Sequence, residues 1–132
     1  MKLTRASNYA LQALAYLLEQ PPDKSVASHV VAEARGIPER FLLKVLQPLV
    51  SAGVLRSIKG PNGGYRLARP ARQITLLEVV EAVDGPIHGV APLSEESKDP
   101  LDGRLQAVSD QLAEQLRRHL GKVRLSDLAG MK

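Results

Sequence analysis

The sequence predicts a mainly α-helical fold with a small two-stranded β-wing, namely a winged helix-turn-helix followed by a long C-terminal helix. Three features predict it: apolar residues at helical spacing up to residue 53, a glycine-rich hairpin pattern near residue 60, and an amphipathic stretch over 102–120. We expect a helix-turn-helix domain over residues 1–86, a loop over 87–101, and the long helix with a tail over 102–132.

The first expected helix runs from Thr4 to about Gln20 and carries a broad apolar stripe that ends at Pro21. Asn8 and Gln12 interrupt the stripe, so we interpret the segment as a retained helix and not as a signal peptide. No apolar run reaches the roughly 18 residues of a membrane span. We therefore expect a cytoplasmic protein.

Two further helices, over residues 28–36 and 37–53, form the expected helix-turn-helix. Gly36 suits the left-handed position after the first, and Pro38 suits the first turn of the second. The inward positions are expected to be Val30, Val31, Ala34, Phe41, Leu42, Val45, Leu46 and Leu49. The outward side chains of the second helix are then Glu39, Arg40, Leu43, Lys44 and Gln47. Taken alone, a helical hairpin is weak evidence, because many protein cores contain one.

A hairpin with three cations follows. The stretches "VLRSI" and "YRLAR" have the pattern of short strands, and "GPNGG" between them supplies the positive φ angles of a tight turn. Arg56, Lys59 and Arg66 would surround this wing and contact phosphate or a narrow minor groove. The alternatives are a solvated hairpin, or a phosphate-binding enzyme loop. The latter lacks the Lys-Ser/Thr pair and following helix of a P-loop.

Positive charge is concentrated in the first half of the chain. Residues 1–70 contain ten Lys/Arg and four Asp/Glu, whereas residues 71–132 contain eight and ten. This asymmetry fits a nucleic-acid surface on the first part only, although a solvated surface with chance asymmetry is the alternative.

Four segments together resemble a known family. They are "MKLTRASNYALQAL", "VAEARGIPERFLLKVLQPLVSAGVL", "RSIKGPNGGYRLARP" and "QITLLEVVEAVDGP", and they extend from Met1 to about Pro86. In this order they resemble the Rrf2 family of bacterial winged-helix regulators, which includes the iron–sulfur assembly repressor and the nitric-oxide-sensing repressor.

The resemblance implies a homodimeric transcription factor that binds a palindromic promoter site on double-stranded DNA, and we expect a repressor. The candidate DNA-contacting residues are Ser28, His29, Pro38, Glu39, Arg40, Phe41, Lys44, Arg56, Lys59, Gly60, Asn62, Gly63, Gly64, Tyr65 and Arg66. For His29, an ordinary surface role is the favoured alternative. Many members have glutamate at the position of Leu43, so the preferred DNA site is expected to differ.

The family's iron–sulfur members carry three cysteines in the loop before the long helix. Here that loop, "IHGVAPLSEESKDPLDGR", has none, and neither has the rest of the chain, so we expect no cluster and no other cofactor. The available ligands are His88, Glu95, Glu96, Asp99 and Asp102. Their irregular spacing favours a mobile polar loop over a metal site.

The C-terminal part is expected to mediate dimerisation. Thr75 and Glu78 match a capping box that opens a helix over 76–84. A longer helix from Asp102 to about Leu120 has one apolar stripe, formed by Leu105, Val108, Leu112, Leu116 and Leu120. The resemblance implies packing against the partner's equivalent helix, and the alternative is packing on its own domain. The tail would fold onto the partner or fray.

An enzyme is not expected, because the histidines at 29, 88 and 119 lie far apart and no common catalytic motif occurs. Two alternatives to a freely DNA-binding regulator stay open. One is a regulator gated by a small molecule or a protein partner, and the other is a winged helix that serves protein interaction.

Overall fold

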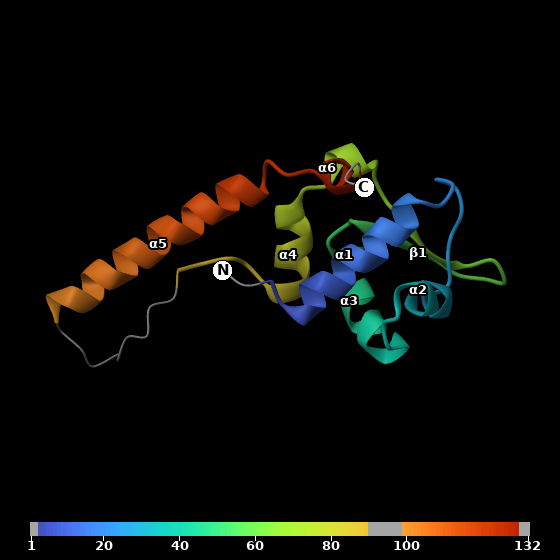
Figure 1. Cartoon of the computed structure of the whole chain (residues 1–132), viewed down its shortest axis with the longest axis horizontal. Coiled ribbons are helices and arrows are strands. Elements are labelled where there is room, and N and C mark those ends of the chain that lie inside the picture. The colour runs from blue at the N-terminus through green and yellow to red at the C-terminus, as the bar shows by residue number, and fades with distance from the viewer. Residues whose placement is uncertain (1–2, 90–98, 130–132) are drawn as a thin grey trace.

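The computed structural model describes residues 3–89 and 99–129, to which all structural statements refer. Three helices come first: α1 (Arg5–Leu18), α2 (Ser28–Arg35) and α3 (Glu39–Ser51). The wing follows as β1 (Leu55–Ile58) and β2 (Gly64–Leu67), then the short 3₁₀ helix η1 (Ala71–Gln73) and α4 (Leu76–Asp84). The long α5 (Pro100–Leu120) extends away from this body, and α6 (Leu125–Ala129) returns to it (Figure 1). The predicted mainly helical, winged fold is confirmed.

One apolar core draws residues from α1, α2, α3, β1, α4 and α6, while β2 and η1 pack against it through Tyr65, Leu67 and Ala71. It is formed by Ala10, Ala13, Leu14, Leu17, Val26, Val31, Ala32, Ile37, Leu42, Val45, Leu46, Leu49, Val54, Leu55, Ile74, Val79 and Leu125. Leu125 comes from the tail and is only 3% exposed. Its backbone N–H donates to Ile74 O at 2.8 Å, so this part of the tail packs on its own chain.

Three positions predicted to face inward are exposed: Val30 and Ala34 on α2, and Phe41 on α3. The short α2 buries Val31 and Ala32 instead, because α1 and α3 cover that side. Phe41 lies at the edge of the buried stripe, one position before Leu42, and contacts cations instead of the core. The apolar pattern was too short on α2, and too broad on α3, to locate the edge of the buried face.

The wing is a two-stranded antiparallel sheet in which Arg56 pairs with Arg66 and Ser57 pairs with Tyr65. Val26, in the loop before α2, adds a bridge to Tyr65 through N–H···O bonds of 2.9 and 2.8 Å. This pairing fastens the wing to the start of α2.

Polar contacts position the ends of α1 and α4. Thr4 caps α1 by accepting the Ser7 N–H, and the Thr4 hydroxyl donates to Asp84 at 2.7 Å. Ser7, which is fully buried, also donates to Asp84, at 2.5 Å. The carboxylate therefore lies beside the N-terminus of α1, where the helix dipole favours negative charge. The expected capping box of Thr75 and Glu78 opens α4.

Candidate nucleic-acid interface

The turn between α2 and α3 brings the N-terminal ends of both helices together. Gly36 adopts the left-handed conformation, with φ 64°, directly after α2. The Ser28 hydroxyl at the start of α2 donates to the Glu39 carboxylate at the start of α3 across 3.4 Å. Pro38 immediately precedes α3 instead of lying within its first turn, and its carbonyl accepts the N–H groups of Phe41 and Leu42. Helix N-termini present free N–H groups, which attract phosphate.

The exposed side of α3 carries a cluster of two cations and one ring. The Arg40 guanidinium carbon lies 4.7 Å from the centre of the Phe41 ring, and Lys44 Nζ lies 5.8 Å from it. Arg5 and Tyr9 of α1 line a cavity of about 220 Å³ with Phe41 and Lys44. Arg5 and Tyr9 are not among the predicted site residues, since only the packing of α1 on α3 places them here.

The wing presents its cations in two ways. Arg56 and Lys59 are exposed, as are Gly60 and Asn62 at the turn. Arg66 is half-buried, and one guanidinium nitrogen donates to Asp23 O at 3.4 Å. The wing thus offers exposed charge at its outer strand and turn, with Arg66 directed toward the loop before α2.

A groove of about 570 Å³ separates the wing from that loop. Lys24 and Ser25 line one side, and Ile58, Asn62 and Arg66 line the other. Lys24 and Ser25 were missed at the sequence level, because only the Val26–Tyr65 pairing brings their loop to the wing. The groove is also lined by Asp23, and beside this carboxylate it adds an ammonium and a hydroxyl to the donors expected for phosphate.

Several predicted site residues have structural roles. A Cβ on Gly64 would lie 2.3 Å from the Val26 carbonyl carbon, and one on Gly63 would lie 2.2 Å from Ile58 O. Tyr65 packs against the core. These three residues therefore maintain the shape of the wing. His29 is exposed on the first turn of α2.

Arg69, the fourth basic residue of the wing region, is engaged within the fold. It donates to Gly53 O at 3.2 Å and Gln73 O at 2.9 Å, and forms a 2.7 Å ion pair with Glu78. Burial raises the pKa of Glu78, but the bonds from Arg69 and Thr75 lower it more, so this pKa lies below its ordinary value. Arg69 therefore connects the base of the wing to α3 and α4.

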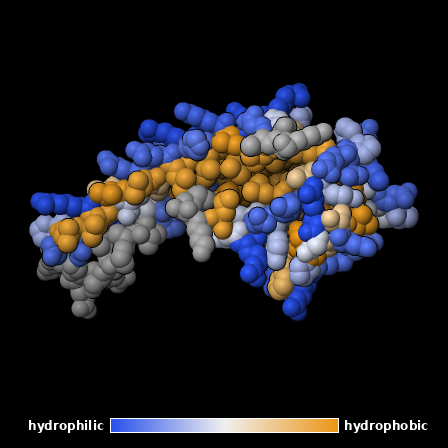
Figure 2. All heavy atoms as spheres, viewed as in Figure 1, coloured by the Kyte–Doolittle hydropathy of each residue, from blue (hydrophilic) through white to orange (hydrophobic). Residues whose placement is uncertain are grey.

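The apolar stripe of α5 is largely uncovered in the single chain. Leu105, Val108 and Leu112 are 43%, 52% and 60% exposed, whereas Leu116 is half-buried and Leu120 is buried. Figure 2 shows the hydrophobic surface running along α5 and continuing onto the body of the molecule. An apolar band of this kind marks an interaction surface.

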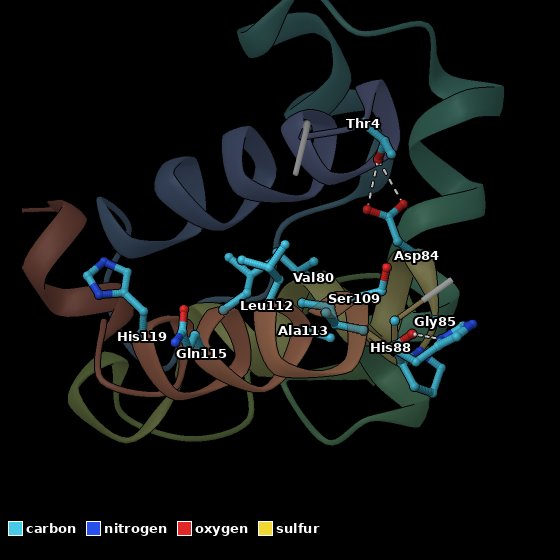
Figure 3. A pocket seen from close by; sticks show the side chains of 14 residues that line it. Thr4, Val80, Asp84, Gly85, His88, Ser109, Leu112, Ala113, Gln115 and His119 are labelled. Carbon is cyan, nitrogen blue, oxygen red and sulfur yellow. Dashed lines mark hydrogen bonds between the residues drawn. The ribbon is translucent and has the colours of Figure 1, made fainter. Parts of the chain in front are cut away.

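A cavity of about 720 Å³ adjoins this stripe. Thr4, Asp84 and His88 lie on one side of it, and Leu112 and His119 of α5 lie on the other (Figure 3). Its lining comes from the start of α1, the end of α4 with the segment that follows, and the long helix. Its lining offers apolar contacts together with carboxylate, hydroxyl and imidazole groups.

A winged helix-turn-helix with cations on its second helix and wing defines a DNA-binding protein. The chain belongs to the Rrf2 family, whose model, described as "Iron-dependent Transcriptional regulator", matches residues 3–130. It is therefore a DNA-binding transcriptional regulator and not an enzyme. Within the described ranges, no helix is both long and apolar enough to cross a bilayer.

Relatives and solved structures agree with this assignment. The HTH-type transcriptional regulator IscR of Cereibacter sphaeroides is 31% identical over 134 residues, which cover 97% of this chain and 86% of IscR. Protein aau3 of Rhizobium meliloti is 43% identical over 84 residues, 64% of this chain, and the chain spans about half (54%) of its length. The structure of CymR, the global cysteine regulator of B. subtilis, aligns over 100% of this chain and 98% of its own, with a TM-score of 0.79 at 23% identity, which shows the fold.

The iron in the family description has no matching thiolate site here. A cysteine-ligated iron–sulfur cluster does not fit a chain of 132 residues without cysteine. Over residues 3–89 and 99–129, no three His, Cys, Asp or Glu side chains are grouped so as to hold a metal ion. Glu95 and Glu96 lie outside the described residues.

Proposed function

We propose that the protein is a cytoplasmic, homodimeric repressor that binds a palindromic promoter site without an iron–sulfur cluster. The observation that carries the proposal is the continuity of the DNA-facing groups. Ser28 joins the start of α2 to Glu39 at the start of α3, and Val26 joins the loop before α2 to Tyr65 of the wing. The recognition helix α3, the phosphate-binding start of α2 and the cationic wing thus form one continuous row of DNA-facing groups.

Each candidate residue has a proposed contact with DNA along this row. Arg40 and Lys44 reach into the major groove from α3, with Pro38, Glu39 and Phe41 beside them. Ser28 and the neighbouring N–H groups of α2 hold backbone phosphate, and the exposed His29 lies beside them. Arg56, Lys59 and Arg66 contact phosphate from the wing. There Gly60 lets the backbone approach closely, Asn62 is exposed beside it, and Gly63 and Gly64 keep the shape of the turn.

The dimer is proposed from the exposed stripe of α5. Leu105, Val108 and Leu112 would be covered by the same helix of a second copy, and Leu116 and Leu120 would continue that contact toward the body. A two-fold dimer places two recognition helices symmetrically, which requires a palindromic site. Occupying a promoter in this way blocks transcription.

Fluorescence anisotropy of the metal-free protein tests DNA binding. Duplexes from its own upstream region are compared with shuffled duplexes across a salt series. We expect preference for the native sequence and affinity that falls steeply with salt, because phosphate contacts release counterions. Equal, weak and salt-insensitive binding to both duplexes would refute the proposal and favour a protein-interaction module.

Sedimentation equilibrium tests the dimer. Leu112→Asp places a charge on the most exposed leucine of the stripe, and Val30→Asp, on the exposed side of α2, is the matched control. Leu112→Asp should be monomeric and Val30→Asp dimeric, while both stay folded. A dimeric Leu112→Asp, or a monomeric wild type, would contradict the proposal.

Gating by a small molecule is a second candidate, favoured by the 720 Å³ cavity between the segment after α4 and α5. A ligand held there by Asp84, His88 or His119 would change how α5 sits on the body. The test adds the dialysable fraction of a bacterial lysate to the anisotropy assay. Wild-type affinity should change, whereas Ala113→Trp, whose indole occupies part of the cavity, should not respond. No response from the wild type would argue against gating.

A further inference from the structure

Two large apolar side chains lie exposed on the cationic face of α3. Phe41 is 37% exposed and Leu43 is 41% exposed, on a helix that buries four other apolar residues completely or nearly so. The proposed row of DNA contacts uses the cations of this helix and does not explain the leucine.

Phe41 has surroundings that account for it. Its ring lies beneath Arg40 and Lys44, at 4.7 and 5.8 Å, and it lines the small cavity with Arg5 and Tyr9. The ring thereby holds two flexible cations in place, which reduces the entropy lost when they bind DNA.

No contact within the described residues explains why Leu43 is exposed. It belongs neither to the core nor to the partly buried apolar residues packed against it. By helical spacing it lies one turn from Glu39 and one turn from Gln47, on the opposite flank from Phe41. A polar side chain would be equally compatible with folding at this position.

The neighbouring charges indicate which surface Leu43 faces. Arg40 and Lys44 occupy the centre of the same exposed face, and the wing adds further cations. A cationic surface of this kind complements DNA, and the C5-methyl of thymine is the apolar group that the major groove presents. We propose that Leu43 contacts a thymine methyl and so selects an A·T pair at one position of each half-site. This inference rests on the proposed sequence-specific binding.

Thymine-to-uracil scanning tests the contact without altering the protein. In the preferred duplex each thymine is replaced singly by deoxyuridine, which removes only the methyl group. Burying one such group is worth roughly 0.8 kcal/mol, so one thymine per half-site should lose about fourfold in affinity. In two further duplexes the same T·A pair is replaced by C·G, with either cytosine or 5-methylcytosine, which carries its methyl at the same place as thymine. The duplex with 5-methylcytosine should bind more tightly than the one with cytosine.

Leu43→Ala identifies the residue responsible. In this variant the deoxyuridine effect should vanish at that thymine, while other positions respond as in the wild type. Val30→Ala, an exposed apolar residue of α2, is the control and should keep the effect. An effect that persists in Leu43→Ala, or no effect of any thymine in the wild type, overturns the inference and leaves the proposed function standing. Absence of sequence preference from the start overturns both.

Discussion

Arg117 of α5 donates to Glu81 of α4 across 2.8 Å, and the same carboxylate oxygen accepts the backbone N–H of Ile87, also at 2.8 Å. One glutamate thus connects α4, the segment that follows it and the long helix. Gln106 reinforces the connection by donating to Gly89 O at 2.9 Å. Residues 85–89, which follow α4, are therefore held against α5.

Replacing Glu81 by alanine should release that segment. A hydrogen bond to a charged group contributes about 1.5 kcal/mol, so the Ile87 amide should exchange with solvent roughly tenfold faster. Amide hydrogen exchange measures this directly. Glu114→Ala removes an exposed partner of Arg118 on the same long helix and should leave Ile87 unchanged. Equal exchange at Ile87 in Glu81→Ala and the wild type would show that the bond does not hold the segment.

Lys59 and Arg69 should separate DNA binding from folding. Lys59 is exposed at the wing turn, whereas Arg69 bonds to Gly53, Gln73 and Glu78. Lys59→Ala should weaken binding to every duplex and reduce the salt slope by about 1, with an unchanged melting temperature. Arg69→Ala should cost about 1–2 kcal/mol of unfolding free energy and leave the salt slope intact. Anisotropy across a salt series measures DNA binding, and urea denaturation measures the free energy of unfolding. If Lys59→Ala lowered stability and Arg69→Ala lowered the salt slope, the roles assigned to these two residues would be wrong.

Stability should depend on pH through Glu78. Its pKa is lower in the folded protein, because the bonds from Arg69 and Thr75 outweigh the effect of burial, which raises it. The ionised carboxylate therefore stabilises the fold above the unfolded-state pKa, and this stabilisation is lost as pH falls through the folded-state pKa. Glu78→Gln should be less stable than the wild type near neutral pH.

The difference in unfolding free energy between Glu78→Gln and the wild type should shrink as the pH falls below the ordinary glutamate value of 4.5. Urea denaturation at several pH values measures it. Glu114→Gln, on the exposed side of α5, is the control and should show little difference at any pH. A constant deficit of Glu78→Gln from neutral to acidic pH would contradict the assignment.

Two wing glycines should respond differently to alanine. Gly60 and Gly64 both have positive φ, at 110° and 147°, but a Cβ meets nothing within 4 Å at Gly60 and lies 2.3 Å from Val26 at Gly64. Gly60→Ala should therefore cost about 1–2 kcal/mol from backbone strain alone. Gly64→Ala should cost more, since its Cβ would also clash with Val26 and weaken the Val26–Tyr65 pairing that joins the wing to the loop before α2. Urea denaturation compares the two, and equal costs would mean that the Val26 contact adjusts freely.

Much of the fold could be predicted because its signals are local. The capping pair of Thr75 and Glu78, the left-handed Gly36 and the glycine-rich wing turn each depend on a few neighbouring residues. Phe41 was placed inward wrongly, because helical spacing indicates a stripe but not its edge. The role of Gly64 depends on Val26, which lies far from it along the chain, and the role of Arg69 depends on Gly53 and Glu78, which lie outside the wing.

The sequence by itself determined the order of helices and wing, the excess of positive charge in the first half and the lack of thiolate ligands, because these follow from composition and local spacing. Only the tertiary structure decided that Lys24 and Ser25 lie beside the wing, that Leu125 enters the core and that the α5 stripe stays exposed. The physical reason is that burial and contact depend on which distant segments pack together, and no local pattern records that choice.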